Sequence, residues 1–164
     1  RAFGMQILYT DLLTFPAKER RLKARRVPLD RLLTQSDVLT LHVPLTERTR
    51  GIIGARELRL MRRHALLINC ARGALLDTQA VARALEAGRL GGAGVDVFDP
   101  ELPPRTHPLL KCANAILSPH NAAQTPEARR NYAAVVLDVL RVLRGERPAF
   151  PANWPQQLRK KQRL

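Results

Sequence analysis

The sequence predicts an α/β domain with a doubly wound parallel sheet and helices on both faces. Short apolar runs of strand length alternate along the chain with segments of helical periodicity. Several of these segments carry helix start and stop signals. The length of 164 residues suits one domain, and 45% of the residues are hydrophobic. Because only 4% are aromatic, the core must consist mainly of Leu, Val, Ile and Ala.

The expected elements follow from these patterns. Strands are expected within residues 6–10, 38–42, 65–69, 91–98 and 115–118. Helices are expected at residues 28–35, 55–61, 77–88 and 125–145. Asp77 and Thr125 have the side chains of N-caps, and Gly88 suits the end of its helix. The basic stretch 17–26 is expected to be exposed, with a short helix at most.

The net charge of +14 arises mostly from Arg. It is compatible with an acidic partner such as nucleic acid or an anionic membrane, but scattered basic residues favour a solvated surface. The densest cluster, residues 159–163, falls in a tail expected to be loosely ordered. No apolar run is long enough to span a membrane. Cys70 and Cys112 lack metal-like spacing, Cys70 is expected to be buried, and a reducing cytoplasm is the expected location.

Polar residues follow most of the predicted strands. Parallel α/β sheets bind ligands beyond the carboxyl ends of their strands, so these residues are candidates for a site. They are Asp11, His42, Asn69–Arg72, Asp96 and His120.

Three of the candidate side chains together suggest a reaction. The guanidinium of Arg72 can grip a carboxylate with two hydrogen bonds, and Gly73 permits a tight turn beside it. The imidazole of His120 can exchange a proton near neutral pH, and Glu101 can orient it. This set suits the reduction of a 2-keto acid, given a hydride donor. Taken singly, Arg72 and Glu101 are more typical of ordinary loop residues, and His120 is equally compatible with one. The weaker candidates are His42, His64 and His107.

Four motifs in order resemble those of one enzyme family. They are Asn69-Cys70-Ala71-Arg72-Gly73-Ala74-Leu75-Leu76-Asp77, Leu85-Glu86-Ala87-Gly88-Arg89-Leu90, Gly94-Val95-Asp96-Val97-Phe98-Asp99-Pro100-Glu101 and Ser118-Pro119-His120. The sequence is similar to the D-isomer-specific 2-hydroxyacid dehydrogenases, which include phosphoglycerate dehydrogenase and glyoxylate/hydroxypyruvate reductase. The resemblance extends from Arg1 to about Pro148 and implies a Rossmann-type domain that binds NAD.

The resemblance also implies roles for individual residues. The catalytic Arg, Glu and His of the family fall on Arg72, Glu101 and His120. The acid that binds the adenosine ribose and favours NAD over NADP falls on Asp11. Other cofactor contacts fall on Val43, Pro44, Cys70, Ala71, Arg72, Asp96, His120, Asn121 and Ala122. No metal site is implied.

The chain departs from the family pattern at its beginning. The motif G-x-G-x-x-G and the first strand are absent, and both are expected upstream of Arg1 together with the substrate domain. The expected layout is therefore a partial NAD-binding domain at residues 1–148 and a tail at 149–164. Such a chain is expected to bind NAD poorly and to be inactive alone, while the full-length protein is expected to act on a small 2-hydroxy or 2-keto acid as a homodimer.

Two other functions stay open at this point. One is a non-enzymatic, NAD-sensing protein of the corepressor type on the same fold, because a fold alone does not fix a function. The other is a nucleic-acid-binding module, which only the net charge suggests.

Overall fold

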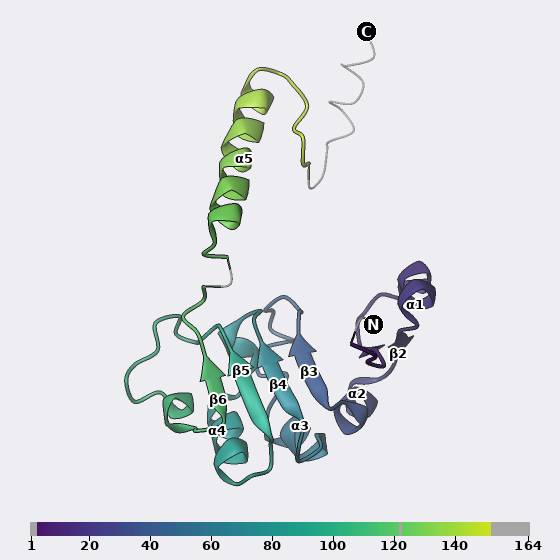
Figure 1. Cartoon of the computed structure of the whole chain (residues 1–164), viewed down its shortest axis with the longest axis vertical. Helices are drawn as coiled ribbons and strands as arrows, with labels where there is room; N and C mark the ends of the chain where they lie inside the picture. Colours follow the sequence, from purple (N-terminus) through teal and green to yellow (C-terminus); the bar gives the residue numbers. More distant parts are fainter. Residues whose placement is uncertain (1–2, 122, 152–164) are drawn as a thin grey trace. The chain divides into compact units, whose positions relative to one another are not determined.

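A computed structural model describes residues 3–121 and 123–151 (Figure 1). The chain divides into two compact units, Arg1–Asn121 and Ala122–Leu164. Within the described residues, the strands all belong to the first unit, and the second unit contains one long helix.

The first unit is built on a parallel sheet of four strands in the order β3-β4-β5-β6. The strands are β3 (Val38–Leu41), β4 (Leu66–Asn69), β5 (Gly92–Val95) and β6 (Ala115–Leu117). Their order in space is their order in the sequence, and all neighbouring pairs are parallel. The carboxyl ends of the four strands therefore lie at the same edge of the sheet. This arrangement confirms the predicted parallel α/β fold.

Helical segments connect these strands and pack against one another. They are α2 (Leu29–Gln35), α3 (Ala55–Leu60), the 3₁₀ turns η1 (Gly73–Leu75) and η2 (Pro108–Lys111), and α4 (Thr78–Glu86). Helix α3 packs against α2 and α4, and α4 packs against η2. The predicted N-cap of α4 is present, because the carboxylate of Asp77 accepts the N–H of Ala80 at 3.0 Å. Gly88 follows that helix with a φ of +60°.

The core of this unit is aliphatic, as the composition predicts. Its most completely buried apolar side chains are Leu33, Ile53, Met61, Leu67, Leu75, Val81, Leu90, Val97 and Leu109. Phe98 is the aromatic side chain that joins the buried core cluster. Leu39 and Leu67 face this core from adjacent positions of β3 and β4, which fixes the covered face of the sheet.

The opposite face of the sheet, which the sequence also predicts to be covered, exposes apolar side chains in the described part of this unit. Val38 is 44% exposed, Leu66 is 43% exposed and Ile116 is 80% exposed. The strands follow one another in sequence, and parallel crossovers are nearly always right-handed, so consecutive connections fall on the same face. The connecting helices therefore cover one side of β3–β6 and leave the other open.

A second, two-stranded sheet precedes the main one. Strand β1 (Leu8–Tyr9) pairs in parallel with β2 (Arg25–Arg26), and α1 (Pro16–Leu22) joins them. Strand β1 is shorter than the predicted run at residues 6–10. Strand β2 was not predicted, because two adjacent arginines give no apolar signal.

The second unit contains α5 (Pro126–Leu143), which begins and ends close to the predicted bounds. The hydroxyl of Thr125 accepts the N–H of Ala128 at 3.1 Å, so the predicted N-cap is present. The carboxylate of Asp138 accepts two backbone N–H groups of residues 149–150, and these bonds lower the pKa of Asp138. In the described ranges, no helix combines the length and apolar character needed to cross a bilayer. Most of the predicted tail, including the basic cluster at 159–163, lies outside the described residues.

Candidate active site

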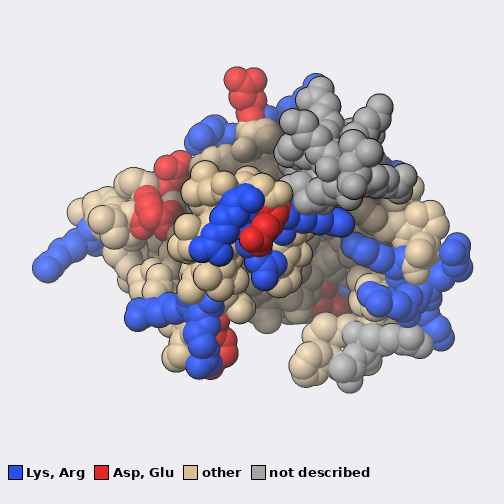
Figure 2. Space-filling model, turned by 90° about the horizontal axis from the view of Figure 1, so that it is seen from above, with Lys and Arg blue, Asp and Glu red and all other residues tan. Residues whose placement is uncertain are grey.

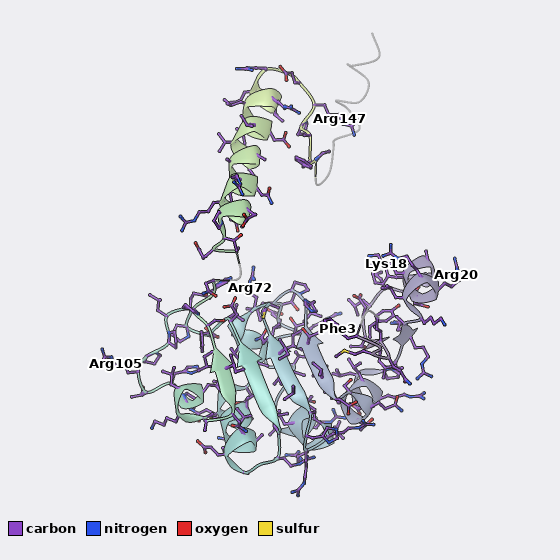
Figure 3. The ribbon with its side chains drawn as sticks, viewed as in Figure 1. Phe3, Lys18, Arg20, Arg72, Arg105 and Arg147 are labelled. Atoms are coloured by element: carbon purple, nitrogen blue, oxygen red, sulfur yellow. The ribbon has the colours of Figure 1, made fainter. Side chains whose placement is uncertain are left out.

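Three of the predicted site residues come directly after neighbouring strands. Arg72 follows β4, Asp96 follows β5 and His120 follows β6. Since these strands are parallel, the three residues lie along the carboxyl edge of the sheet, and Figure 3 shows Arg72 there. This edge is where open α/β sheets bind their ligands.

The side chains of Glu101 and His120 are in contact at this edge. Nδ1 of the imidazole donates a hydrogen bond to Oε1 of the carboxylate. Among the described residues, Nε2 of His120 has no partner. The imidazole side chain is 49% exposed, so a ligand can reach this second nitrogen. A carboxylate on one nitrogen fixes the tautomer and leaves the other nitrogen to exchange a proton.

Asp96, at the end of β5, is hydrogen-bonded to three residues of the turn after β6. Its side chain lies in a residue only 5% exposed, and its Oδ1 accepts a hydrogen bond from the hydroxyl of Ser118 at 2.5 Å. The same oxygen accepts the N–H of Asn121 at 3.2 Å. The backbone carbonyl of Asp96 accepts the N–H of His120 at 2.8 Å. Asp96 therefore ties the end of β5 to the turn after β6.

The turn that carries Arg72 is organised by Asn69, whose role the sequence did not reveal. Asn69 is fully buried at the end of β4, and its side-chain amide donates to the carbonyl of Arg72 at 2.9 Å. Its side-chain oxygen accepts the N–H of Ala71 at 3.1 Å. Nη1 of Arg72 donates to the carbonyl of Ala71 at 2.6 Å, while the rest of this exposed guanidinium is available to a ligand. The sequence signal that could have indicated this role is a side-chain amide at the end of an apolar strand.

Gly73 joins the Arg72 turn to the loop that leads to Glu101. A Cβ atom at Gly73 would lie 2.1 Å from the carbonyl carbon of Phe98 and 2.6 Å from the nitrogen of Asp99. The glycine is therefore required for close backbone approach, and not for the tight turn that the sequence suggested. The two loops that carry Arg72 and Glu101 are packed against each other at this point.

A hollow of about 570 Å³ opens at the carboxyl ends of β3 and β4. Five of the residues assigned to cofactor contacts line it, namely Val43, Pro44, Cys70, Ala71 and Arg72. Cys70 is exposed, so the expectation of a buried thiol was wrong. The apolar run ends at Asn69, and the next residue already lies in the turn beyond the sheet. An open, partly apolar hollow at this edge fits part of a dinucleotide.

Asp11 follows β1 and is exposed. Its Oδ1 accepts the N–H of Leu13 at 2.9 Å, which folds the carboxylate over its own turn. Nε and Nη2 of Arg26 donate to the carbonyl of Asp11 at 3.0 and 2.6 Å. The acid thus has a fixed position at the end of its strand. Ala122, the last predicted cofactor contact, lies outside the described residues.

The three weaker histidine candidates have separate surroundings. His42 lines the hollow and hydrogen-bonds Thr40 at 3.0 Å. His64 contacts the carboxylate of Asp37 at 2.9 Å and, together with a neighbouring arginine, lowers the pKa of that acid. His107 is 6% exposed, and burial lowers its pKa. Within the described chain, Nδ1 of His107 has no partner, and no group of His, Cys, Asp or Glu is arranged to hold a metal ion.

Basic side chains are spread over the face seen in Figure 2, with acidic side chains between them. Arg56 pairs with Asp30 at 2.6 Å, and Arg62 pairs with Asp37 at 2.7 Å. These partners are themselves exposed, so the pairs contribute little to stability.

The parallel sheet, with an arginine, a buried aspartate and a histidine–glutamate pair at its carboxyl edge, defines a domain of the dinucleotide-binding class. Residues 1–122 match the family model described as the NAD binding domain of D-isomer specific 2-hydroxyacid dehydrogenases. The chain belongs to this family.

Individual relatives agree with this assignment. The chain is 44% identical over 154 residues to a glyoxylate reductase of Korarchaeum cryptofilum, covering 93% of this chain and 46% of the relative. It is 39% identical over 157 residues to a D-3-phosphoglycerate dehydrogenase of Methanocaldococcus jannaschii, covering 94% of this chain and 30% of the relative. The chain thus spans at most about half the length of these relatives.

Solved structures give the same result. The TT0316 protein of Thermus thermophilus matches with a TM-score of 0.83 and 40% identity, over 93% of this chain and 47% of that one. The D-lactate dehydrogenase of Lactobacillus jensenii, solved with NAD+, matches with a TM-score of 0.83 and 30% identity, over 93% and 50%.

Proposed function

We propose that the protein carrying this chain transfers a hydride between NAD(H) and a small D-2-hydroxy acid or 2-keto acid. The observation that carries the proposal is the contact between Glu101 and His120 at the same sheet edge as the Arg72 turn. Family membership supports it, because the relatives named above include a glyoxylate reductase and a D-lactate dehydrogenase.

Arg72 binds the substrate carboxylate in this proposal. Its planar guanidinium offers two parallel N–H donors, which match the two oxygens of a carboxylate. Held by Asn69 through its backbone, the residue places a fixed positive charge beside the carbonyl that is to be reduced. This charge stabilises negative charge that develops on the carbonyl oxygen.

His120 moves the proton. In the direction of reduction, the protonated imidazole gives a proton from Nε2 to the developing alkoxide oxygen. In the direction of oxidation, the neutral imidazole accepts the proton from the substrate hydroxyl. Glu101 binds Nδ1 throughout, so it orients the ring and keeps Nε2 directed at the substrate.

The cofactor, when bound, supplies or accepts the hydride. Val43, Pro44, Cys70 and Ala71 would hold it along the hollow. Further contacts would come from Asp96, Asn121 and Ala122, and Asp11 would bind the adenosine ribose hydroxyls.

The chain by itself is expected to bind NAD weakly and to show little turnover. Its sequence contains no G-x-G-x-x-G motif, and such a loop supplies the amides that hold the pyrophosphate. We propose that residues 1–148 form part of an NAD-binding domain followed by a tail at 149–164, and that the complete protein is a homodimer. Calorimetry on the chain tests the expected weak binding of NAD, since micromolar affinity would contradict it.

The decisive assay follows NADH oxidation by the complete protein that carries this chain. Glyoxylate, pyruvate and hydroxypyruvate are offered in turn, because the names of relatives point to acids of this size. At least one of them is expected to support turnover, and Arg72→Lys is expected to suppress it. A protein that binds NADH but reduces none of these acids would overturn the proposal and favour a cofactor-sensing role.

A further inference from the structure

His120 has a backbone conformation that non-glycine residues seldom adopt. Its φ is +52°, in the left-handed region, where the Cβ atom is crowded by the following carbonyl. Such a conformation persists only where the surrounding contacts determine it. The direction of the imidazole therefore depends on whatever holds the turn at residues 118–121.

Asp96 makes several of the hydrogen bonds that hold this turn. Asp96 accepts the N–H of His120 with its backbone carbonyl and the N–H of Asn121 with Oδ1, at 2.8 and 3.2 Å. The turn is thus bound at the histidine and at the residue after it. Both bonds require that the end of β5 and the carboxylate of Asp96 stay in place.

Ser118, which precedes His120 in the sequence, also binds the carboxylate of Asp96. Its hydroxyl donates to Oδ1 at 2.5 Å, and its own N–H donates to the carbonyl of Val95 at 3.0 Å. A carboxylate in a residue only 5% exposed needs such donors, and hydrogen bonds to a charged acceptor are among the stronger ones. Oδ1 of Asp96 therefore accepts hydrogen bonds from both Ser118 and Asn121.

We propose that Ser118 is a positioning residue for His120, which it holds through Asp96. The hydroxyl keeps Oδ1 where it can accept the N–H of Asn121, and that bond keeps the left-handed turn closed at His120. The chemical consequence, a correctly directed proton donor, rests on the function proposed above.

A matched pair of substitutions tests the proposal in the complete protein. Ser118→Thr keeps the hydroxyl, whereas Ser118→Val has nearly the same shape and lacks it. Thr is expected to keep kcat for keto-acid reduction within about twofold, and Val is expected to lose about tenfold, the effect of one hydrogen bond to a charged group. The KM for the keto acid, which Arg72 governs, is expected to change little in both. Ser36→Ala, which removes a hydroxyl bound to the carbonyl of Leu32 at the end of α2, is the control and should leave kcat unchanged.

Amide hydrogen exchange on the present chain gives a readout that does not depend on catalysis. The amides of His120 and Asn121 are expected to exchange faster in Ser118→Val than in Ser118→Thr, with the amides of β3 and β4 unchanged. Equal exchange, or equal kcat, in the two variants would overturn the positioning role of Ser118. If the parent protein reduces no keto acid, the proposed function fails, while the exchange rates still decide the role of Ser118.

Discussion

The imidazole of His120 donates a hydrogen bond from Nδ1 to the carboxylate of Glu101, although the two residues are 19 positions apart in the sequence. The contact forms between the segments that follow two neighbouring parallel strands, because Glu101 lies after β5 and His120 lies after β6. A carboxylate acceptor on Nδ1 orients the imidazole and leaves Nε2 to exchange a proton with a substrate.

Substitution of His120 should lower kcat for keto-acid reduction by the complete protein more than substitution of Glu101. His120→Ala removes the proton donor and is expected to lower kcat for reduction by about 10²–10⁴-fold. Glu101→Gln keeps a hydrogen-bonding side chain and removes the charge, so a smaller loss of kcat is expected. Initial rates of NADH oxidation measure both effects. An unchanged kcat in Glu101→Gln, with chemistry rate-limiting, would show that this carboxylate does not assist the histidine.

Arg72 should be sensitive even to a change that keeps its charge. Arg72→Lys replaces a planar fork of donors by an ammonium group, which cannot bind a carboxylate in bidentate fashion. We expect kcat/KM for the keto acid to fall by about tenfold or more. Arg105→Lys, in the exposed loop beyond Glu101, is the control and should retain full activity. Comparable losses in the two variants would argue against a substrate contact by Arg72.

Asp11 should determine the choice of cofactor. A carboxylate at the end of its strand repels the 2′-phosphate of NADP, so NADH should be the better donor in the complete protein. Asp11→Ala is expected to lower the ratio of kcat/KM for NADH to kcat/KM for NADPH. Equal values for the two cofactors in the parent would exclude Asp11 as the selector.

Gly73 should tolerate no side chain, because a Cβ would lie 2.1 Å from the backbone of Phe98. Gly73→Ala is expected to lower the free energy of unfolding by about 1–3 kcal/mol, the usual cost of overpacking, or more because backbone must move. Urea unfolding of the present chain measures this. Gly54→Ala is the control, since the nearest atom to its Cβ would be Oε2 of Glu57 at 3.5 Å. Equal urea midpoints for the two variants would show that the backbone at Phe98 can move at little cost in free energy.

The elements with periodic apolar residues were predictable, and the exceptions have physical causes. Strand β2 consists of two arginines and forms because β1 offers it a backbone partner. The exposure of Cys70 follows from where β4 ends, which hydrophobicity does not show. Asn69 and Ser118 were missed as organising residues, because a single amide or hydroxyl has many possible roles until its partners are known.

His107 should make stability depend on pH. Burial lowers its pKa, so the unfolded chain binds a proton more readily than the folded chain just below the ordinary value of about 6.5. The contribution of His107 is therefore fully present above about pH 6.5 and is lost as pH falls through the lowered value. Urea unfolding at about pH 7.5 and pH 5 should show a smaller decrease in His107→Leu than in the parent. An identical decrease in both would assign the effect to other groups.

The proposed acid–base residues are confined to one continuous stretch of chain. The segment from β5 to the turn after β6 contains Asp96, Glu101, Ser118 and His120, whereas Arg72 belongs to the preceding segment. Recombination between related enzymes could therefore transfer the proton-handling apparatus as one cassette from Gly92 to Asn121. The compatibility of donor and host would depend on the contact between Gly73 and Phe98, because there two inherited backbones must fit without space for a methyl group.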